Sequence, residues 1–237
     1  MATSGGPNII TDGLVLHLDA ANTKSYSGGG NTWSDLSGNG NDGTLINGPI
    51  FNENGTFTFD GSNDYVEVHH NFLKPETTNI RESITVSIFC KSDGSSSSGW
   101  NMYWSGVSKY SQFILGPNGI GGKMAFVVNS GGWYPSGYSG DIWGQESIDI
   151  REYHYYTGTY NKSSGMLTLY VDGNLEADFN VGIFTLTNDP NSFSLNKRDV
   201  SGNHLKSTNS IFHIYNRALT QSEVLQNYNA TRSRFGL

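Results

Sequence analysis

Thr56–Val68 reads TFTFDGSNDYVEV, and this stretch indicates the fold class. At both of its ends, apolar and polar side chains alternate with the period of two that is typical of a half-buried β-strand. Between the ends, Asp60-Gly61-Ser62-Asn63-Asp64 is a cluster of turn-forming residues, whose Asp and Asn side chains commonly accept hydrogen bonds from backbone N–H groups. The stretch therefore predicts two strands joined by a tight turn.

Strand-length stretches of this kind recur along the chain and are separated by further turn signals. Asn118-Gly119 and Asp172-Gly173 are dipeptides typical of tight turns, in which Gly adopts positive φ. The predicted strands span residues 14–18, 56–59, 65–68, 84–90, 112–115, 124–128, 153–160, 166–171, 191–195 and 211–215. Because no helical pattern lies between them, the chain is predicted to be all-β, with antiparallel strands in a sandwich of two sheets.

One short helix is predicted near the C-terminus. Thr220-Gln221-Ser222-Glu223 fits a capping box, in which the Thr hydroxyl and the Glu carboxylate each accept a hydrogen bond from an otherwise unpaired backbone N–H group. Val224, Leu225 and Tyr228 follow at helical spacing. These signals predict a helix of about ten residues that begins after Thr220.

The composition excludes several classes of protein. The chain is rich in Gly, with 30 residues, and poor in strong helix formers, so it is not mainly helical. Its 35% of hydrophobic residues and 13% of aromatic residues exclude a disordered chain. The net charge of −7 and the lack of a Lys/Arg cluster in the sequence argue against a nucleic-acid partner. Apolar runs have only strand length, so no membrane insertion is expected.

The single cysteine and the histidines are expected to be structural. Cys90 is in step with Ile84, Val86 and Ile88, which predicts a buried free thiol on the inner face of a strand. His17, His154 and His213 lie within predicted strands and are expected to be packing or surface residues. The opening residues 1–7 lack the charged and apolar regions of a secretory signal peptide.

Several motifs occur in a fixed order and resemble those of one family. They are Asp35–Asn41 (DLSGNGN), Phe59–Val66 (FDGSNDYV), the segment 155–173 with YYTGTY and LYVDG, and Ile214–Glu223 (IYNRALTQSE). Together they resemble the laminin-G-like jelly rolls of the concanavalin A-like lectin/glucanase superfamily. The resemblance implies an antiparallel jelly-roll β-sandwich of two sheets with one short C-terminal helix. It does not fix a function, because this fold hosts lectins, enzymes and adhesion modules.

The resemblance also implies a domain organisation. Residues 9–237 are expected to form one jelly-roll domain, preceded by a flexible tail over residues 1–8. Arg217, just before the helix, is expected to pair with an aspartate of the turns at Asp60, Asp64 or Asp172.

A narrower resemblance concerns the two ends of the chain. Gly13–Asn22 and Glu223–Leu237 are similar to the start and the end of laminin-G-like virion proteins of tailed phages, notably those of cyanobacterial hosts. This resemblance implies a place on a virion surface, as a capsid decoration or a tail-fibre protein. An extracellular location is the alternative.

Aromatic residues gather in two segments rich in Gly and Ser, 99–104 and 131–143. Sugars stack their C–H faces on Trp and Tyr rings, so these segments are candidate loops for binding a glycan or a protein. Alternatively, the rings fill the ends of the sandwich or a subunit interface, and Trp100 and Trp104 alternate as in a core strand. The candidate binding residues are Trp100, Tyr103, Trp104, Trp133, Tyr134, Tyr138 and Trp143.

The resemblance also implies a possible structural Ca²⁺, although no cofactor is required. Relatives often hold this ion with oxygen ligands from N-terminal turns. Asp19, Asp35, Asn39 and Asn41 offer such oxygens here.

Catalysis is not expected. Retaining glucanases of the superfamily carry carboxylates two or three positions apart on one strand, and the nearest match is Glu146, Asp149 and Glu152. Its first spacing of three would put Glu146 and Asp149 on opposite faces of a regular strand.

The sequence therefore favours a non-catalytic, lectin-like module on a phage virion. Its expected partners are cell-surface or capsule glycans, neighbouring coat proteins, or both, and it is expected to be oligomeric or assembled on the virion. A purely structural decoration protein that binds no sugar is the first alternative, and a glycoside hydrolase is the second.

Overall fold

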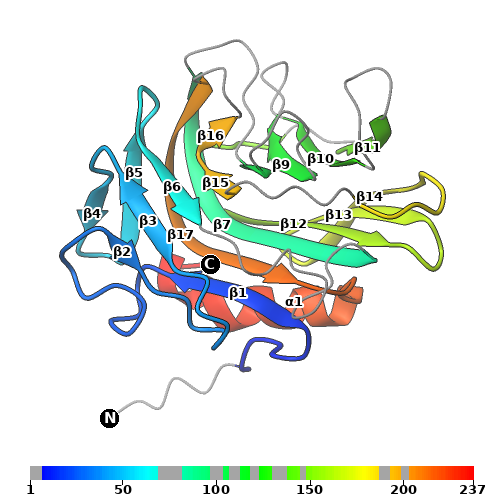
Figure 1. Cartoon of the computed structure of the whole chain (residues 1–237), viewed down its shortest axis with the longest axis horizontal. Coiled ribbons are helices and arrows are strands. Elements are labelled where there is room, and N and C mark those ends of the chain that lie inside the picture. Colours follow the sequence, from blue (N-terminus) through cyan, green and yellow to red (C-terminus); the bar gives the residue numbers. More distant parts are fainter. Residues whose placement is uncertain are drawn as a thin grey trace.

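The computed structural model describes residues 7–68, 82–96, 104–106, 113–117, 123–129, 138–144, 148–186, 193–198 and 203–237. Figure 1 shows strands arranged as a jelly-roll sandwich, with one helix along its lower side. The strand pairings within these residues are antiparallel. The predicted fold class is confirmed.

One sheet has nine strands. They are β1 (Leu14–Asp19), β4 (Ile50–Asn52), β5 (Thr56–Asp60), β7 (Ser83–Ser96), β12 (His154–Asn161), β13 (Met166–Val171), β14 (Asn174–Asn180), β16 (Lys197–Arg198) and β17 (Asn203–Tyr215). Their order is β14-β13-β12-β7-β17-β5-β4, and β1 and β16 also pair with β17. The long strands β7 and β17 therefore form the centre of this sheet.

The other sheet has eight strands. They are β2 (Thr32–Trp33), β3 (Gly43–Ile46), β6 (Tyr65–Val68), β8 (Trp104–Gly106), β9 (Phe113–Pro117), β10 (Met124–Asn129), β11 (Tyr138–Trp143) and β15 (Phe193–Leu195). Their order is β11-β10-β9-β8-β15-β6-β3-β2. This sheet contains the segments of the predicted aromatic loops that the structure describes.

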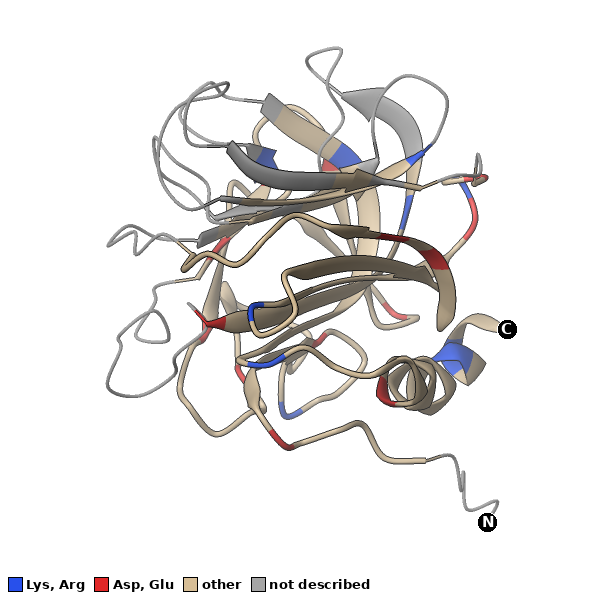
Figure 2. Ribbon diagram, turned by 90° about the vertical axis from the view of Figure 1, so that its right-hand side faces the viewer, with Lys and Arg blue, Asp and Glu red and all other residues tan. Residues whose placement is uncertain are grey.

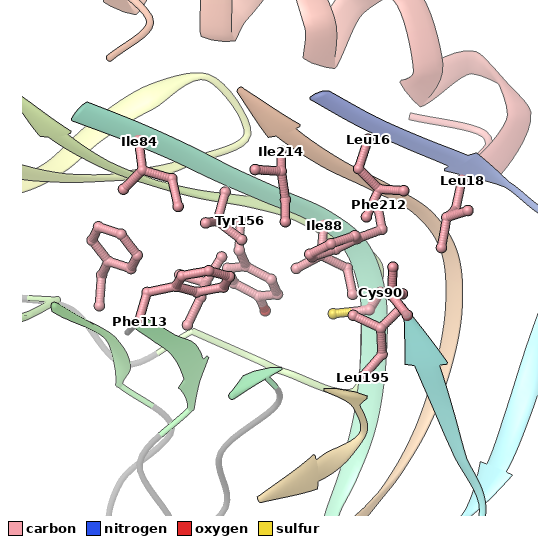
Figure 3. Close-up of a cluster of buried hydrophobic side chains, with 14 of the residues drawn as sticks. Leu16, Leu18, Ile84, Ile88, Cys90, Phe113, Tyr156, Leu195, Phe212 and Ile214 are labelled. Atoms are coloured by element: carbon pink, nitrogen blue, oxygen red, sulfur yellow. The ribbon is translucent and has the colours of Figure 1, made fainter. Parts of the chain in front are cut away.

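The main hydrophobic core fills the space between the sheets. Figure 3 shows side chains from both sheets directed toward one another. Ile88, Cys90 and Phe212 come from the nine-stranded sheet, and Phe113 and Leu195 come from the eight-stranded sheet; each is at most 2% exposed. Because inward-facing residues alternate with outward-facing ones along each strand, this packing explains the period of two in the sequence. The predicted buried free thiol at Cys90 is confirmed.

A second, smaller core lies on the outer face of the nine-stranded sheet, beneath the helix α1 (Gln221–Thr231) and the 3₁₀-helix η1 (Arg232–Phe235). Figure 2 shows α1 nearly end-on, outside the sheets. Phe89 of β7 stacks on Phe235 of η1, with ring centroids 4.1 Å apart. Val224 of α1 is fully buried in the same cluster. The C-terminal segment thus covers part of this outer face.

The start of α1 follows the sequence prediction. The Thr220 side chain accepts from the Glu223 N–H at 3.4 Å, and the Thr220 N–H donates to the Glu223 carboxylate at 2.8 Å. The expected pairing of Arg217 with a turn aspartate is wrong, because its guanidinium pairs with Glu223 at 2.7 Å and with Asp12 at 2.9 Å. Glu223 lies next to Arg217 because the capping box holds its carboxylate at the start of the helix.

The predicted turns have the expected chemistry. Asp172 and Gly173 adopt φ of 53° and 80° between β13 and β14, as a tight hairpin requires. At the end of β5, Asp60 Oδ1 accepts from the backbone N–H groups of Ser62 and Asn63 at 2.8 and 3.2 Å. Asp64 Oδ2 in turn accepts from the Asp60 N–H at 3.1 Å.

Part of the aromatic-loop prediction is wrong in its secondary structure. Tyr138–Trp143 forms strand β11, where a loop was predicted, whereas Trp104 begins strand β8, in line with the alternative of a core strand at that position. β11 pairs with β10 from Ala125 to Asn129, and these backbone hydrogen bonds outweigh the weak strand propensity of its Gly and Asp residues. Within the described residues, no helix has the length and apolar character needed to cross a bilayer.

Candidate functional site

Three of the predicted aromatic binding residues lie in the eight-stranded sheet. Trp104 of β8 pairs with Leu115 of β9, whereas Tyr138 and Trp143 are the first and last residues of the edge strand β11. Because β9 and β10 lie between β8 and β11, Trp104 and Trp143 are roughly 14 Å apart across the strands. The structure thus places Trp104 and Trp143 in one sheet but one position out of step, because Trp104 is aligned through Leu115 and Phe126 with Ile142, the residue before Trp143.

The other aromatic candidates, Trp100, Tyr103, Trp133 and Tyr134, lie outside the described residues. Their role in binding therefore stays a prediction. The structure does describe the strands next to them in the chain. β8 begins at Trp104, directly after Tyr103, and Trp133 and Tyr134 lie in the sequence between β10 and β11.

Three of the predicted Ca²⁺ ligands lie together in the turn that precedes β3. Asp35 Oδ1 accepts from the His17 N–H at 2.9 Å, and Oδ2 accepts from the Asn41 N–H at 3.0 Å. The side-chain amides of Asn39 and Asn41 donate to the Val15 carbonyl at 3.2 and 2.9 Å. These contacts fasten the turn to β1.

The fourth predicted ligand, Asp19, has a different partner. Its side chain is 3% exposed, and its Oδ1 and Oδ2 accept from Nη1 of Arg234 at 2.8 and 2.6 Å. The Ala21 N–H also donates to Oδ1 at 3.0 Å. The Arg234 guanidinium thus supplies the positive charge that balances this buried carboxylate.

These contacts do not form a ready-made Ca²⁺ ligand set. Ca²⁺ takes six to eight oxygen ligands, so it would have to displace Arg234 from Asp19 and backbone N–H groups from Asp35. Within the described residues, the buried Oδ1 of Asn41 lacks a hydrogen-bond partner, but it is one oxygen only. No three His, Cys, Asp or Glu side chains in these ranges are grouped to hold a metal. The structural Ca²⁺ stays a prediction.

The glucanase-like carboxylates lie in and before the turn that leads into β12. Glu146 is outside the described residues, whereas Asp149 is exposed and accepts two hydrogen bonds from Arg151, at 2.7 and 2.6 Å. These hydrogen bonds, together with one from the Arg151 backbone, lower the pKa of Asp149 to about 2. A general acid needs a raised pKa, so Asp149 is unsuited to that role.

A histidine cluster that the sequence did not indicate lies next to the Asp19–Arg234 pair. His213 is fully buried, its Nδ1 lies 3.0 Å from Oη of Tyr155, and its ring meets that of His17 edge-on, with centroids 4.7 Å apart. Burial lowers the pKa of His213 well below its ordinary value, and the positive charge on Arg234, and on His17 when it is protonated, adds to this effect. Burial also lowers the pKa of His17, although the carboxylates of Asp19 and Asp35 oppose it. Both imidazoles are therefore held neutral, in line with the expected packing role.

His154 has the opposite electrostatic environment. Its Nδ1 lies 2.7 Å from Oδ2 of Asp172. Although burial lowers the pKa of His154, the hydrogen bond and the charge of Asp172 outweigh it, so the pKa is raised. The strand position alone gives no sign of this pairing, because Asp172 follows β13 and comes next to His154 only when β12 and β13 pair.

The geometry and the sequence agree on the family. Residues 60–225 match the Laminin_G_3 family, described as the concanavalin A-like lectin/glucanases superfamily. The chain belongs to this superfamily. No match was found among the curated proteins.

Solved structures with the same fold include toxin domains. The receptor-binding domain of botulinum neurotoxin C/D mosaic serotype has a TM-score of 0.66 and 17% identity, with 94% of this chain and 52% of that chain covered. The serotype D ligand-binding domain in complex with N-acetylneuraminic acid has the same values. The neurotoxin DC binding domain in complex with rat synaptotagmin II has a TM-score of 0.64 and 20% identity, with 93% and 52% covered. At this identity the likeness shows the superfamily fold, and this chain spans about half the length of those domains.

Proposed function

We propose that the protein is a non-catalytic carbohydrate-binding module that acts at the surface of a tailed-phage virion. The observation that carries the proposal is membership of the lectin/glucanase superfamily, over residues 60–225 of a two-sheet sandwich. Within this superfamily, the choice lies between binding a sugar and cleaving one.

The described carboxylates favour binding over cleavage. A retaining glycosidase needs two carboxyl groups about 5 Å apart, one with a raised pKa. Asp149 is held ionised by Arg151, with a pKa of about 2. Glu152 lies in the same exposed turn, where its N–H donates to the Asp149 carbonyl at 3.0 Å. This arrangement supports a tight turn in which Asp149 is unsuited to the role of general acid.

The solved relatives support a recognition role in general terms. Their titles name N-acetylneuraminic acid for one domain and synaptotagmin II for another, so this fold occurs within domains whose structures were solved in complex with a sugar acid and with a protein. For the present chain we propose glycans as the first partner and neighbouring coat proteins as the second. The virion context rests on the resemblance of Gly13–Asn22 and Glu223–Leu237 to phage proteins.

A glycan array probed with the purified protein, with Ca²⁺ and with a chelator, tests the proposal. We expect binding to a limited set of glycans and no release of reducing sugar from them. The double variant Trp133→Ala/Tyr134→Ala should lose the signal from neutral glycans, because stacking on these rings is proposed to hold them. Absence of binding under both conditions would favour the structural decoration protein. Hydrolysis of an arrayed polysaccharide would favour the glycosidase.

A further inference from the structure

A small cavity opens on the outer face of the nine-stranded sheet, beside the part of that face that the C-terminal segment covers. It has a volume of about 300 Å³. β5, β7, β17 and the turn before β12 contribute its lining residues, which are Thr58, Lys91, Ser92, Arg151, Lys206, Ser207 and Thr208. We call this cavity the cationic groove. It is separate from the aromatic candidates, which lie in the other sheet or outside the described residues.

The strand register makes the lining residues of the groove neighbours. Thr208 of β17 lies opposite Lys91 of β7 on one side and opposite Thr58 of β5 on the other. Lys206 follows two residues away from Thr208, and residues two apart on a strand share a face. The backbone of these three neighbouring strands thus fixes the floor of the groove.

The turn before β12 closes one side. The Ser92 N–H donates to the Ile150 carbonyl at 2.7 Å, which holds the turn against β7. Nζ of Lys91 lies 4.6 Å from the centroid of the Tyr153 ring, on the far side of the same turn. Arg151 lies between these two anchors and reaches the groove from the turn.

The groove gathers three basic side chains on an acidic protein. Lys91, Arg151 and Lys206 line it, and no Asp or Glu is among its lining residues, although the chain has a net charge of −7. Two acids lie beside the groove: Asp149 pairs with Arg151, and Asp60, opposite Lys206, accepts backbone N–H groups of its own turn. A guanidinium has five N–H donors, so Arg151 can bind Asp149 and a ligand together.

The remaining lining groups suit a sugar. Hydroxyl groups of Thr58 and Thr208 are available beside the cations, whereas those of Ser92 and Ser207 are buried and bonded to the Lys206 carbonyl and the Asn196 side-chain amide. The aliphatic stems of Lys and Arg offer apolar surface to a C–H face. A volume of about 300 Å³ is at the lower end of ligand pockets, which fits one sugar ring better than a long chain.

We propose that the cationic groove binds a carboxylate-bearing sugar residue of an acidic glycan. The carboxylate pairs with the Lys and Arg side chains through charge-assisted hydrogen bonds, while the hydroxyls and the aliphatic stems contact the ring. This inference rests on the proposed carbohydrate-binding function, and it names the class of sugar and a site for it.

Calorimetric titration with trigalacturonate tests the site, and its neutral methyl ester is the matched ligand. We expect trigalacturonate to bind at least about tenfold more tightly than the ester, and to bind more weakly as salt screens the charges. In Lys91→Gln/Lys206→Gln the affinity should fall about tenfold or more. Lys24→Gln/Lys123→Gln removes the same charge from exposed positions outside the groove and should keep the wild-type affinity.

The outcomes separate this inference from the proposed function. Equal affinity for the acid and the ester, or equal loss in both double variants, would overturn the groove while sugar binding stands. The groove is also overturned if trigalacturonate does not bind but a neutral glycan on the array does. Inorganic phosphate that binds as tightly as trigalacturonate would overturn the sugar assignment. If no glycan of any kind binds, both proposals fail.

Arg151→Gln is a second test of the same site. Its side chain is exposed in a turn, so this variant should fold even if the lysine double variant does not. We expect weaker binding of trigalacturonate with an unchanged melting temperature. Unchanged binding in Arg151→Gln would count against the groove.

Discussion

Gly158 lies within β12, where a ring from the opposite sheet covers it. A Cβ atom at this position would lie 2.3 Å from the ring of Phe126 in β10, closer than any real contact. Because β12 is paired on both sides, with β7 and with β13, its backbone has little freedom to move away. The close approach of the two sheets at this point therefore requires Gly.

We expect Gly158→Ala to lower the free energy of unfolding by about 1–3 kcal/mol, the usual cost of overpacking a core. Urea denaturation followed by tryptophan fluorescence measures it. Gly29→Ala is the matched control, because a Cβ at 29 meets nothing within 4 Å and its φ is not positive. A loss of similar size in both variants would show that the contact with Phe126 is not the cause.

At the scale of elements, the C-terminal segment is joined to the N-terminal strands by polar contacts as well as by its apolar face. Arg234 of η1 pairs with buried Asp19 at the end of β1. Asn227 of α1 accepts from the Ile10 N–H at 2.8 Å and donates to Oη of Tyr215 at 2.9 Å. The segment thus connects the first and last strands of the described chain.

Arg234→Ala should destabilise the protein by on the order of 3 kcal/mol, because it leaves the Asp19 carboxylate buried without its cation. Thermal and chemical unfolding measure the loss. Arg151→Ala removes an exposed partner of an exposed carboxylate and should leave the unfolding free energy almost unchanged. If Arg234→Ala were as harmless as Arg151→Ala, the pair would have no structural role.

Some elements can be predicted from the sequence and others cannot, for a physical reason. β13 and the start of α1 fall where predicted, since β13 buries alternate side chains and Thr220 and Glu223 form a capping box. The edge strands β11 and β14 were not predicted. The sequence of β14, NLEADFN, carries Asn, Asp and Glu because an edge strand has one paired side and mostly solvent around it. Hydrogen bonding to the neighbouring strand stabilises such an edge strand more than its own strand propensity does.

At the scale of the whole molecule, acid should destabilise the fold through its buried histidines. The pKa values of His213 and His17 lie below the ordinary 6.5, so the unfolded chain binds protons that the folded chain does not. The stability is therefore fully present above pH 6.5 and is lost as the pH falls toward the folded-state values. His154, with its raised pKa, has the opposite sign, because its stabilisation is present below 6.5 and is lost as the pH rises.

We expect the free energy of unfolding to fall below pH 6.5 by up to about 1.4 kcal/mol per pH unit for each buried imidazole. His213→Asn, which cannot be charged, should reduce this slope in urea denaturation across a pH series. His154→Asn should leave the slope below pH 6.5 almost unchanged, and it should remove the loss of stability that His154 causes as the pH rises above 6.5. An unchanged slope in His213→Asn would contradict the assignment.

The cationic groove shows what a sequence alone cannot indicate. Lys91, Arg151 and Lys206 are far apart in the chain, and the sequence has no basic cluster. They meet because β17 lies between β5 and β7, an order that is set by packing across the whole sandwich. His154 and Asp172 likewise come into contact only through the pairing of β12 with β13. The superfamily, in contrast, could be predicted from the sequence, because its motifs are turns and a helix cap made of residues that are close together in the chain.

The position of β17 at the centre of the nine-stranded sheet has a consequence for synthesis of the protein. β7 ends at Ser96 and β5 ends at Asp60, whereas β17, which pairs with both, begins only at Asn203. On the ribosome, the two flanking strands emerge long before the strand that joins them. Their edges stay unpaired during that interval and are open to association with other nascent chains. Completion of the sheet therefore awaits synthesis of Asn203–Tyr215, and a chaperone that shields these edges would raise the yield of folded protein.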